Sequence, residues 1–217
     1  MASLPCELDG GGIVVLGSMN PSIFQPAWFA AHNLLRQAEA DAAKIEVVSH
    51  EMTSFVLSWL RVYVVGDRIA VISTSADGLE PMRDLVAGIF TLLEHTPVSA
   101  VGLNRYMHYR VSSLEAWHEV GHRLAPKEPW KGLLANPGML TVRMSGRRPD
   151  ETGGNVNVKV EPSYTVRPHG VFVEVNEHYD RPGAATSEIV ELIKTKFDDS
   201  MTFARQLGDG IVDKDRE

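Results

Sequence analysis

The sequence predicts an α+β protein in which a curved antiparallel sheet carries its helices on one face. Several segments alternate hydrophobic and polar residues and are separated by short turns, which favours antiparallel pairing of neighbouring strands. Two longer segments, 79–95 and 187–207, instead repeat their hydrophobic residues at helical spacing. The order strand, helix, three strands, helix occurs twice. Strands in sequence with helices gathered on one side are typical of α+β packing.

The first half, residues 11–97, begins with a hydrophobic strand directly after three glycines. Pro26 suits the first position of a helix, because the N–H that proline lacks would have no partner there. Gly66 and Asp67 predict a tight turn between two strands. The predicted elements are a strand at 13–16, a helix at 26–43, strands at 45–48, 54–65 and 68–72, and a helix at 79–95.

The second half, residues 98–208, repeats this order without obvious sequence identity to the first. We expect Ser187 to cap its closing helix and Gly208 to end it. Residues 1–10 and 209–217 are predicted to be flexible tails of a single domain that spans 11–208. The predicted elements are a strand at 100–111, a helix at 113–124, strands at 140–144, 156–160 and 171–176, and a helix at 187–207.

Placed side by side, two such halves would form a curved sheet with the two long helices on its back. This arrangement is similar to the saddle of TATA-binding-protein-like folds. The likeness lies in the order of the elements and implies nothing about function.

The composition is that of a globular protein, with 44% hydrophobic and 23% charged residues among 217. No hydrophobic run approaches the roughly 18 residues that a membrane span requires. The first residues lack the basic region and the apolar stretch of a signal peptide. Cys6 is the only cysteine, so no internal disulfide can form. These features predict a soluble protein of the reducing cytoplasm.

The net charge of −7 is unevenly distributed. Residues 101–170 carry ten basic and six acidic side chains, whereas the segments before and after have balances of −6 and −5. One interpretation is an anion-binding or nucleic-acid-binding face in this basic middle segment, and the other is that the segments pair with each other in the folded chain. A chain that is acidic overall repels a polyanion, so nucleic acid is not the favoured partner. The candidate binding residues are Arg105, Arg110, Arg143 and Arg147.

The segment His118-Glu119-Val120-Gly121-His122 matches the H-E-x-x-H pattern of zinc metallopeptidases. On a helix, two histidines four residues apart lie on one side and can bind one zinc ion. Glu119 can then act as general base on the metal-bound water. Such a helix would bury one stripe and leave the motif on its outer side; the expected stripe is Leu114, Trp117, Gly121 and Leu124.

A catalytic zinc also needs a third protein ligand. Glu128 stands six residues after His122, where one large class of these enzymes places that ligand beyond a glycine turn. Here Ala125 and Pro126 occupy the turn, and alanine before proline resists the left-handed conformation that glycine adopts. We therefore expect no zinc; in the alternative, His118, His122 and Glu128 are its ligands.

Two motifs, Gly121-His122-Arg123-Leu124-Ala125-Pro126-Lys127 and Val173-Glu174-Val175-Asn176-Glu177-His178-Tyr179, resemble a family of bacterial proteins. The likeness extends over roughly residues 10–208. That family carries no established activity, so the resemblance implies a shared fold. It also implies that Gly121, His122 and Pro126 have a structural role, in which Glu119 need not take part.

The leading hypothesis is a binding or assembly protein without catalytic activity, whose sheet offers one face to a protein partner or to a second copy. It rests on the regular patterning of the scaffold, the incomplete catalytic set and the polar loops at 125–138 and 146–154. A zinc-dependent metallohydrolase that uses the motif at 118–122 is the alternative. A nucleic-acid or anion binder that uses residues 101–170 is the second alternative. We expect no cofactor and no membrane partner.

Overall fold

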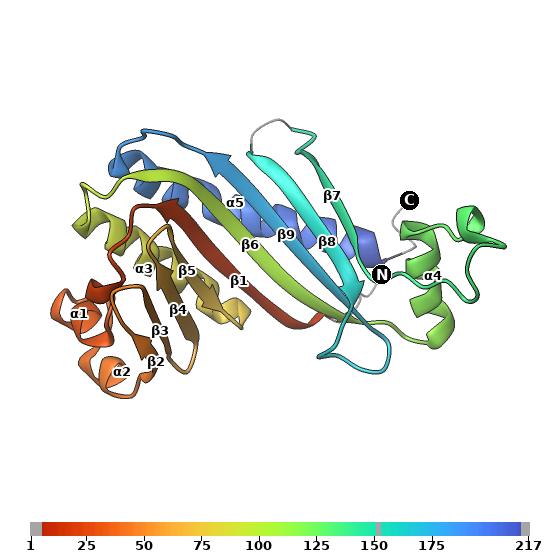
Figure 1. The fold of residues 1–217 in the computed structure, drawn as a ribbon, viewed down its shortest axis with the longest axis horizontal. Coiled ribbons are helices and arrows are strands. Elements are labelled where there is room, and N and C mark those ends of the chain that lie inside the picture. The colour runs from red at the N-terminus through yellow and green to blue at the C-terminus, as the bar shows by residue number, and fades with distance from the viewer. Residues whose placement is uncertain (1–5, 151–152, 214–217) are drawn as a thin grey trace.

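A computed structural model describes residues 6–150 and 153–213 of the chain. Nine strands form one open sheet, and the two long helices pack against one of its faces (Figure 1). Every pairing between neighbouring strands is antiparallel. The predicted α+β class, with an antiparallel sheet and helices on one side, is confirmed.

The strands lie in the order β2-β3-β4-β5-β1-β6-β9-β8-β7, so the first strand of each half occupies the centre of the sheet. These two central strands, β1 and β6, pair along almost their whole length, with Ile13 opposite Leu103. Outward from this pair, each side continues with the last strand of its own half and then with progressively earlier strands. The strands are β1 (Cys6–Gly17), β2 (Lys44–Val48), β3 (Met52–Val56), β4 (Leu60–Val65), β5 (Arg68–Ser73), β6 (Val98–Arg110), β7 (Val142–Arg147), β8 (Asn155–Pro162) and β9 (Gly170–Asp180).

The helices α3 (Leu79–Leu92) and α5 (Thr186–Val212) cover the face of the sheet that carries Ile13 and Leu103. Each helix turns one hydrophobic stripe to the sheet, and removing that stripe from water stabilises the layered packing. The buried residues of the two stripes are Leu79, Met82, Leu85, Val86, Ile89 and Phe90 on α3, and Ile189, Leu192, Ile193, Phe197, Met201 and Ala204 on α5.

The bounds of α5 differ from the prediction at both ends. Its N-cap is Ala185 rather than Ser187, and Glu188 accepts a hydrogen bond of 3.2 Å from the N–H of Ala185. Gly208 was expected to end the helix, but α5 continues to Val212. A Cβ atom at Gly208 would lie 2.6 Å from the Tyr109 hydroxyl oxygen. Glycine therefore lets the helix approach β6 and does not terminate it.

The first half contains two further corrections. The helix predicted at 26–43 is divided into α1 (Pro26–Ala31) and α2 (Gln37–Asp41). Asn33 lies between them in the left-handed conformation, with φ of 57°, which asparagine tolerates better than most residues. The strand predicted at 54–65 is a hairpin of β3 and β4, closed by a hydrogen bond of 2.7 Å from Leu57 N–H to the Leu60 carbonyl. Four strands, β2 to β5, therefore follow α1 and α2, where three were predicted.

A projecting lobe, residues 112–141, extends from the end of the molecule opposite α1 and α2 (Figure 1). It contains α4 (Leu114–Leu124) and a 3-10 helix (Glu128–Trp130). The Ser113 hydroxyl caps α4 by accepting a hydrogen bond of 3.2 Å from Ala116 N–H. The predicted stripe was wrong at its first position: Val120 is 5% exposed, whereas Leu114 is 47% exposed. The helix is therefore anchored through Val120 and its half-buried neighbours.

The ends of the described chain are more ordered than the predicted tails. Residues 6–10 form the first part of β1, and residues 209–212 form the last turn of α5. The remaining predicted tail residues, 1–5 and 214–217, lie outside the described residues. Among the described helices, none combines the length and the apolar character that crossing a bilayer requires.

Candidate functional site

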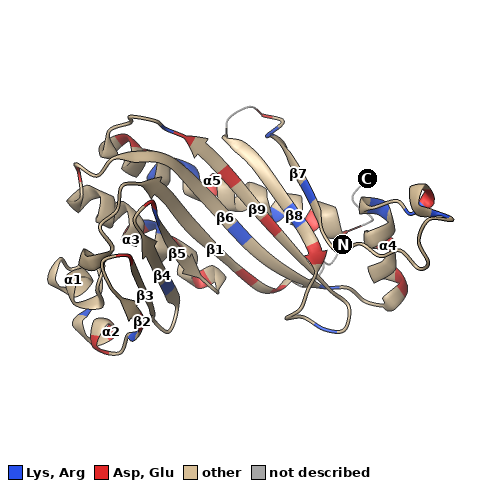
Figure 2. Cartoon of the chain, viewed as in Figure 1, with Lys and Arg blue, Asp and Glu red and all other residues tan. Residues whose placement is uncertain are grey.

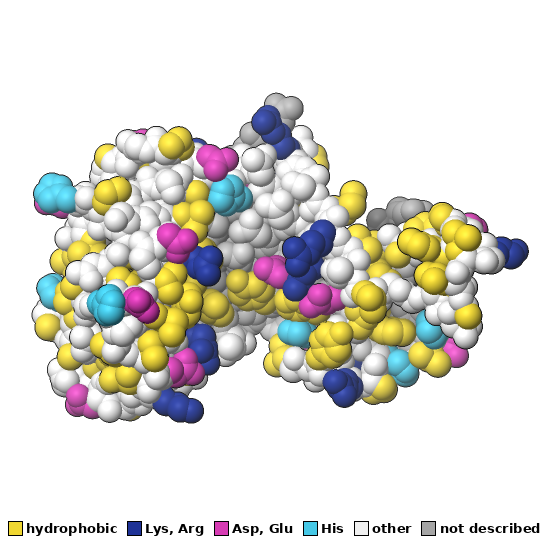
Figure 3. Space-filling model, in the orientation of Figure 1, with side chains coloured by type: hydrophobic (Ala, Val, Ile, Leu, Met, Phe, Trp, Pro, Cys, Tyr) yellow, Lys and Arg dark blue, Asp and Glu magenta, His cyan; other side chains and the backbone are white. Residues whose placement is uncertain are grey.

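The face of the sheet opposite α3 and α5 carries no helix over its central strands in the described part of the chain (Figure 1). We call it the helix-free face. Side chains of successive strand residues alternate between the two faces, so the pairing register determines which residues share it. Asn104 of β6, Asn176 of β9 and Asn157 of β8 stand opposite one another across these strands and therefore lie on one face. Figure 3 shows that this face is hollowed along its middle.

The three asparagines form a hydrogen-bonded amide row across β8, β9 and β6. Asn157 Nδ2 donates to Asn176 Oδ1 at 3.3 Å, and Asn176 Nδ2 donates to Asn104 Oδ1 at 2.9 Å. Asn104 Nδ2 then donates to the carbonyl oxygens of Gly12 at 3.3 Å and Gly102 at 3.2 Å. A side chain at Gly102 would displace the row, because its Cβ would lie 2.8 Å from Asn176 Nδ2.

A polar groove of about 410 Å³ runs beside the amide row. On its floor, Lys159 forms ion pairs of 3.2 Å with Glu161 and 3.4 Å with Glu174. Arg143 of β7 stands directly opposite Lys159. Lys159 is shared by two carboxylates, and Arg143 has no ion-pair partner among the described residues. These four charges sum to zero, with basic residues on β7 and acidic residues on β9 (Figure 2), and Arg143 is the cation among them that is free to bind an anionic group. The other lining residues are Asn104, Met144, Ser145, Asn157, Val158 and Asn176.

A serine and a histidine meet at one end of this face. The Ser163 hydroxyl lies 2.8 Å from His108 Nδ1, and the His108 ring stacks on Phe172 with centroids 4.6 Å apart. Burial lowers the pKa of His108 from its usual value, and the nearby Glu161 raises it by a smaller amount. Ser163 Oγ also accepts backbone hydrogen bonds from Thr165 at 3.2 Å and Val166 at 2.9 Å. The Ser163 hydroxyl is therefore buried and already engaged in three hydrogen bonds.

The four arginines proposed as an anion-binding face do not lie on one face. Arg143 and Arg147 of β7 share the helix-free face with the amide row. Arg105 points to the opposite side, where Asp9 accepts two of its hydrogen bonds and the Met201 carbonyl accepts another. Arg110 is ion-paired with Glu7. Two of the four are therefore neutralised by acids from the N-terminal segment.

The H-E-x-x-H motif lies on the outer side of α4, where His118, Glu119 and His122 are exposed. The two imidazole rings have centroids 6.3 Å apart. Glu128 lies in the 3-10 helix beyond the turn. Within residues 6–150 and 153–213, no three side chains of His, Cys, Asp or Glu gather closely enough to hold a metal ion.

A smaller cavity of about 320 Å³ separates α4 from the ends of β8 and β9. Trp117, Val120 and Met139 give it an apolar lining, and His118, Lys127 and Glu161 contribute polar groups. Of the three polar side chains of the motif, only His118 lines this cavity.

Sequence reasoning missed the amide row. Asn157 was recognisable as a residue that alternates with valines, but its alignment with Asn176 and Asn104 depends on strand order and register. The sequence matches no protein-family model and, at significant similarity, no curated protein. The function is therefore inferred from the geometry of this chain alone.

Proposed function

We propose that this protein is a non-catalytic binding protein of the cytoplasm, whose helix-free face receives an extended polar segment of a partner protein. The amide row is the observation that carries the proposal. The row runs from the buried Asn104 through the half-buried Asn176 to the exposed Asn157, so its outer end offers a partner hydrogen-bonding groups at fixed positions.

Amide side chains suit a polypeptide partner. Each amide carries both donors and acceptors, as does each peptide group, so Asn157 and Asn176 can pair with a main chain of any sequence, while the buried Asn104 anchors the row. The mutual hydrogen bonds hold these side chains in place before binding. Preorganisation of this kind lowers the entropy cost of association.

The charges of the groove indicate an acidic group on that partner. Arg143 has no ion-pair partner among the described residues, and a carboxylate is the planar group that a guanidinium binds with two hydrogen bonds. A polyanion fits less well, because Glu161 and Glu174 line the same region and the chain as a whole carries −7. A protein segment with one or two carboxylates satisfies both observations.

The experiment is site-specific photocrosslinking in the cells that make the protein. A photoreactive residue replaces Ser145, which lines the groove, and in a matched variant it replaces Thr202, which is exposed on α5. We expect one discrete protein adduct from position 145 and none from position 202. Adding Arg143→Glu to the first variant should abolish the adduct, because a carboxylate partner would then be repelled.

Adducts of equal yield from both positions, or an adduct that survives Arg143→Glu, would contradict the proposal. An adduct with nucleic acid instead of protein would favour the anion-binding alternative. The thermal unfolding midpoint of each variant shows whether the fold is retained.

A further inference from the structure

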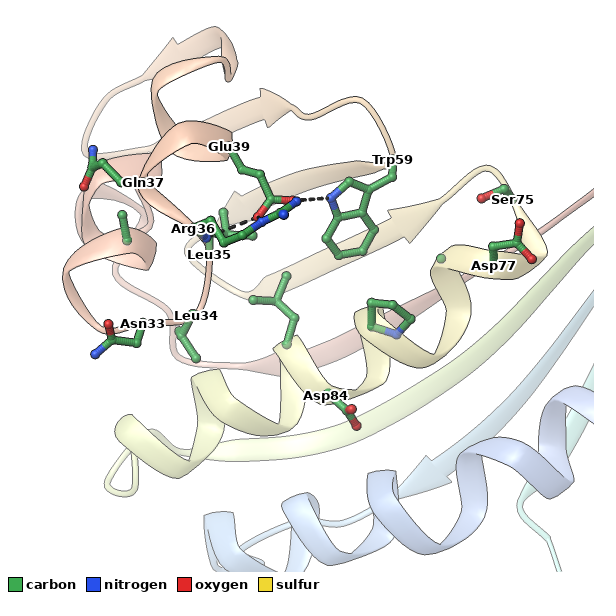
Figure 4. A pocket seen from close by; sticks show the side chains of 14 residues that line it. Asn33, Leu34, Leu35, Arg36, Gln37, Glu39, Trp59, Ser75, Asp77 and Asp84 are labelled. Atoms are coloured by element: carbon green, nitrogen blue, oxygen red, sulfur yellow. Dashed lines mark hydrogen bonds and ion pairs between the residues drawn. The ribbon is translucent and has the colours of Figure 1, made fainter.

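An open groove of about 950 Å³ lies at the end of the molecule that carries α1 and α2 (Figure 4). It is bounded by the α1–α2 connection, the first half of α3 and the turn between β3 and β4. We call it the acidic groove for the charges on its rim.

The walls of the acidic groove are apolar and fixed. Leu34 and Leu35 enter from the α1–α2 connection, and Trp59 faces them from the β3–β4 turn (Figure 4). The Trp59 indole N–H donates to Glu39 Oε1 at 3.1 Å, and Arg36 Nε donates to Glu39 Oε2 at 2.9 Å. The Glu39 carboxylate thus accepts from both neighbours and holds the indole ring in the orientation that leaves the groove open.

The rim along α3 carries excess negative charge. Asp77 and Asp84 line the groove, and Asp77 has no hydrogen-bond or ion-pair partner among the described residues. Arg83 is the basic side chain of this rim. It is shared by three carboxylates, those of Glu80, Asp84 and Asp198. Residues 1–100 as a whole carry five basic and eleven acidic side chains.

The opposite end of the molecule has the complementary character. At the tip of the projecting lobe, Trp130 is 49%, Leu133 is 75% and Leu134 is 57% exposed. Lys127 precedes these side chains and Lys131 lies among them, and neither has an ion-pair partner in the described ranges. With Glu128, residues 127–134 carry a net charge of +1. Three large apolar side chains grouped on a surface protrusion are typical of an interaction site rather than of scattered surface residues. We call residues 127–134 the basic tip.

We propose that the basic tip of one copy of this chain docks in the acidic groove of a second copy. The apolar side chains of the tip would enter between Leu34 and Trp59, and the two lysines would face Asp77 and Asp84. Charges of opposite sign at the rim and apolar contacts at the centre are the usual division of a protein–protein interface. The tip and the groove lie at opposite ends of the long axis (Figure 1), so one chain cannot join its own two ends.

This contact uses two different surfaces and is therefore heterologous. An open assembly keeps one free tip at one end and one free groove at the other until the chain of copies closes into a ring, and a contact whose rotation does not close gives an open filament. The helix-free face takes no part in the contact, so the assembly would display many copies of that face.

The test uses two variants that each disable one end. Leu133→Asp places a charge of the wrong sign at the tip, and Asp77→Lys with Asp84→Lys reverses the groove rim. We expect the wild-type chain to show an average mass in light scattering that rises with protein concentration. Either variant alone should remain at the 23.9 kDa of one chain. Tyr164→Asp is the matched control, because Tyr164 is as exposed as Leu133 and lies elsewhere.

Mixing the two variants distinguishes a head-to-tail contact from a symmetric one. The intact groove of one variant can accept the intact tip of the other, so the mixture should form a complex of two chains and no larger species.

A chain that carries Lys127→Glu, Lys131→Glu and both aspartate-to-lysine changes should regain the concentration-dependent mass, because both charge patterns are reversed together.

A wild-type chain that stays monomeric at all concentrations would overturn the proposal. So would association that survives the groove variant and is lost only in the tip variant, because two tips would then be pairing with each other. Association that Tyr164→Asp also abolishes would place the contact elsewhere. None of these results depends on the partner of the helix-free face. Circular dichroism confirms that each variant keeps its fold.

Discussion

Asp9 of β1 and Arg105 of β6 form a bidentate ion pair beneath α5, with oxygen–nitrogen distances of 2.8 and 2.7 Å. The two side chains are only 14% and 11% exposed. Arg205 of α5 adds a third contact, 2.9 Å from Asp9 Oδ2, and continues to Asp209 at 2.8 Å. The network joins the two central strands to the long helix.

Removing one partner of this pair should destabilise the fold strongly. Asp9→Asn leaves Arg105 charged and poorly solvated, so we expect a loss of about 3–5 kcal/mol in the free energy of unfolding. Urea unfolding monitored by circular dichroism measures it. The matched control is Arg61→Ala at the exposed pair with Glu46, for which about 0–1 kcal/mol is expected. Equal losses at the two pairs would show that burial does not determine their contributions.

Truncation of the α5 stripe tests the layered core. Phe197 is 1% and Leu192 is 7% exposed, so Phe197→Ala and Leu192→Ala should each cost about 2–5 kcal/mol by leaving a cavity. Leu92→Ala on α3 is the control, because Leu92 is 45% exposed and loses little buried area. A small loss for Phe197→Ala in urea unfolding would mean that α5 does not pack as described.

Cys6 should be an unreactive thiol in the folded protein. Burial, together with the negative charge of Asp9, raises its pKa from 9.0 to about 11. The reactive species is the thiolate, so near pH 8 the native thiolate fraction is about 100-fold below that of an ordinary cysteine. The rate of alkylation by iodoacetamide should rise from pH 7 to about pH 10 without a plateau. Asp9→Asn should accelerate the reaction, and a native plateau near the ordinary pKa would refute the assignment.

Glu39 predicts a specific dependence of stability on pH. The hydrogen bond from the Arg36 side chain is the main cause that lowers the pKa of Glu39 from 4.5 to about 2, and the Trp59 indole adds to it. A lowered folded-state pKa contributes stability that is complete above the unfolded value and is lost as pH falls toward the folded value. Wild type should therefore exceed Glu39→Gln by on the order of 1 kcal/mol near pH 6, since Arg36 is largely exposed and screened. That difference should vanish toward about pH 2 in urea titrations, and a constant difference would be contrary to the assignment.

Purified protein should contain well under one equivalent of zinc. Two imidazoles on one helix supply half of a usual zinc shell, and the described residues bring no third ligand to them. Elemental analysis of wild type and His122→Ala should give the same low content, and a chelator should leave the melting temperature unchanged. One equivalent of zinc that is lost in His122→Ala would restore the metallohydrolase alternative.

The fold class was predictable because local patterns carry it. The stripe of α5 and the turn at Gly66 and Asp67 depend on neighbouring residues, and both were read from the sequence. The division of 26–43 at Asn33 was not, because the alanines on both sides of Asn33 favour a helix, whereas the burial of Leu35 after the break depends on tertiary contacts. Gly208 was misread for a related reason: its partner, Tyr109, is distant in sequence. The interpretation of the chain as two repeated halves stays a prediction.

The candidate site was less predictable than the fold. Arg105 and Arg110 are an odd number of residues apart on one strand, so alternation places them on opposite faces. The net charge of a whole segment does not show which face of the sheet each arginine occupies. The amide row requires the register of β6, β9 and β8, which is set by contacts between residues about 20 to 70 positions apart.

The central position of β1 has a consequence for biosynthesis. β1 leaves the ribosome early, yet one of its two neighbours, β6, is made about eighty residues after β1 is complete. During that interval the finished first half would present an unpaired edge of hydrophobic strand residues, which is a template for pairing with other nascent chains. A newly made first half is therefore the species most exposed to aggregation, and slowed translation ahead of residue 98 would prolong that exposure. Chaperone contact should concentrate on this intermediate and decline once β6 has paired.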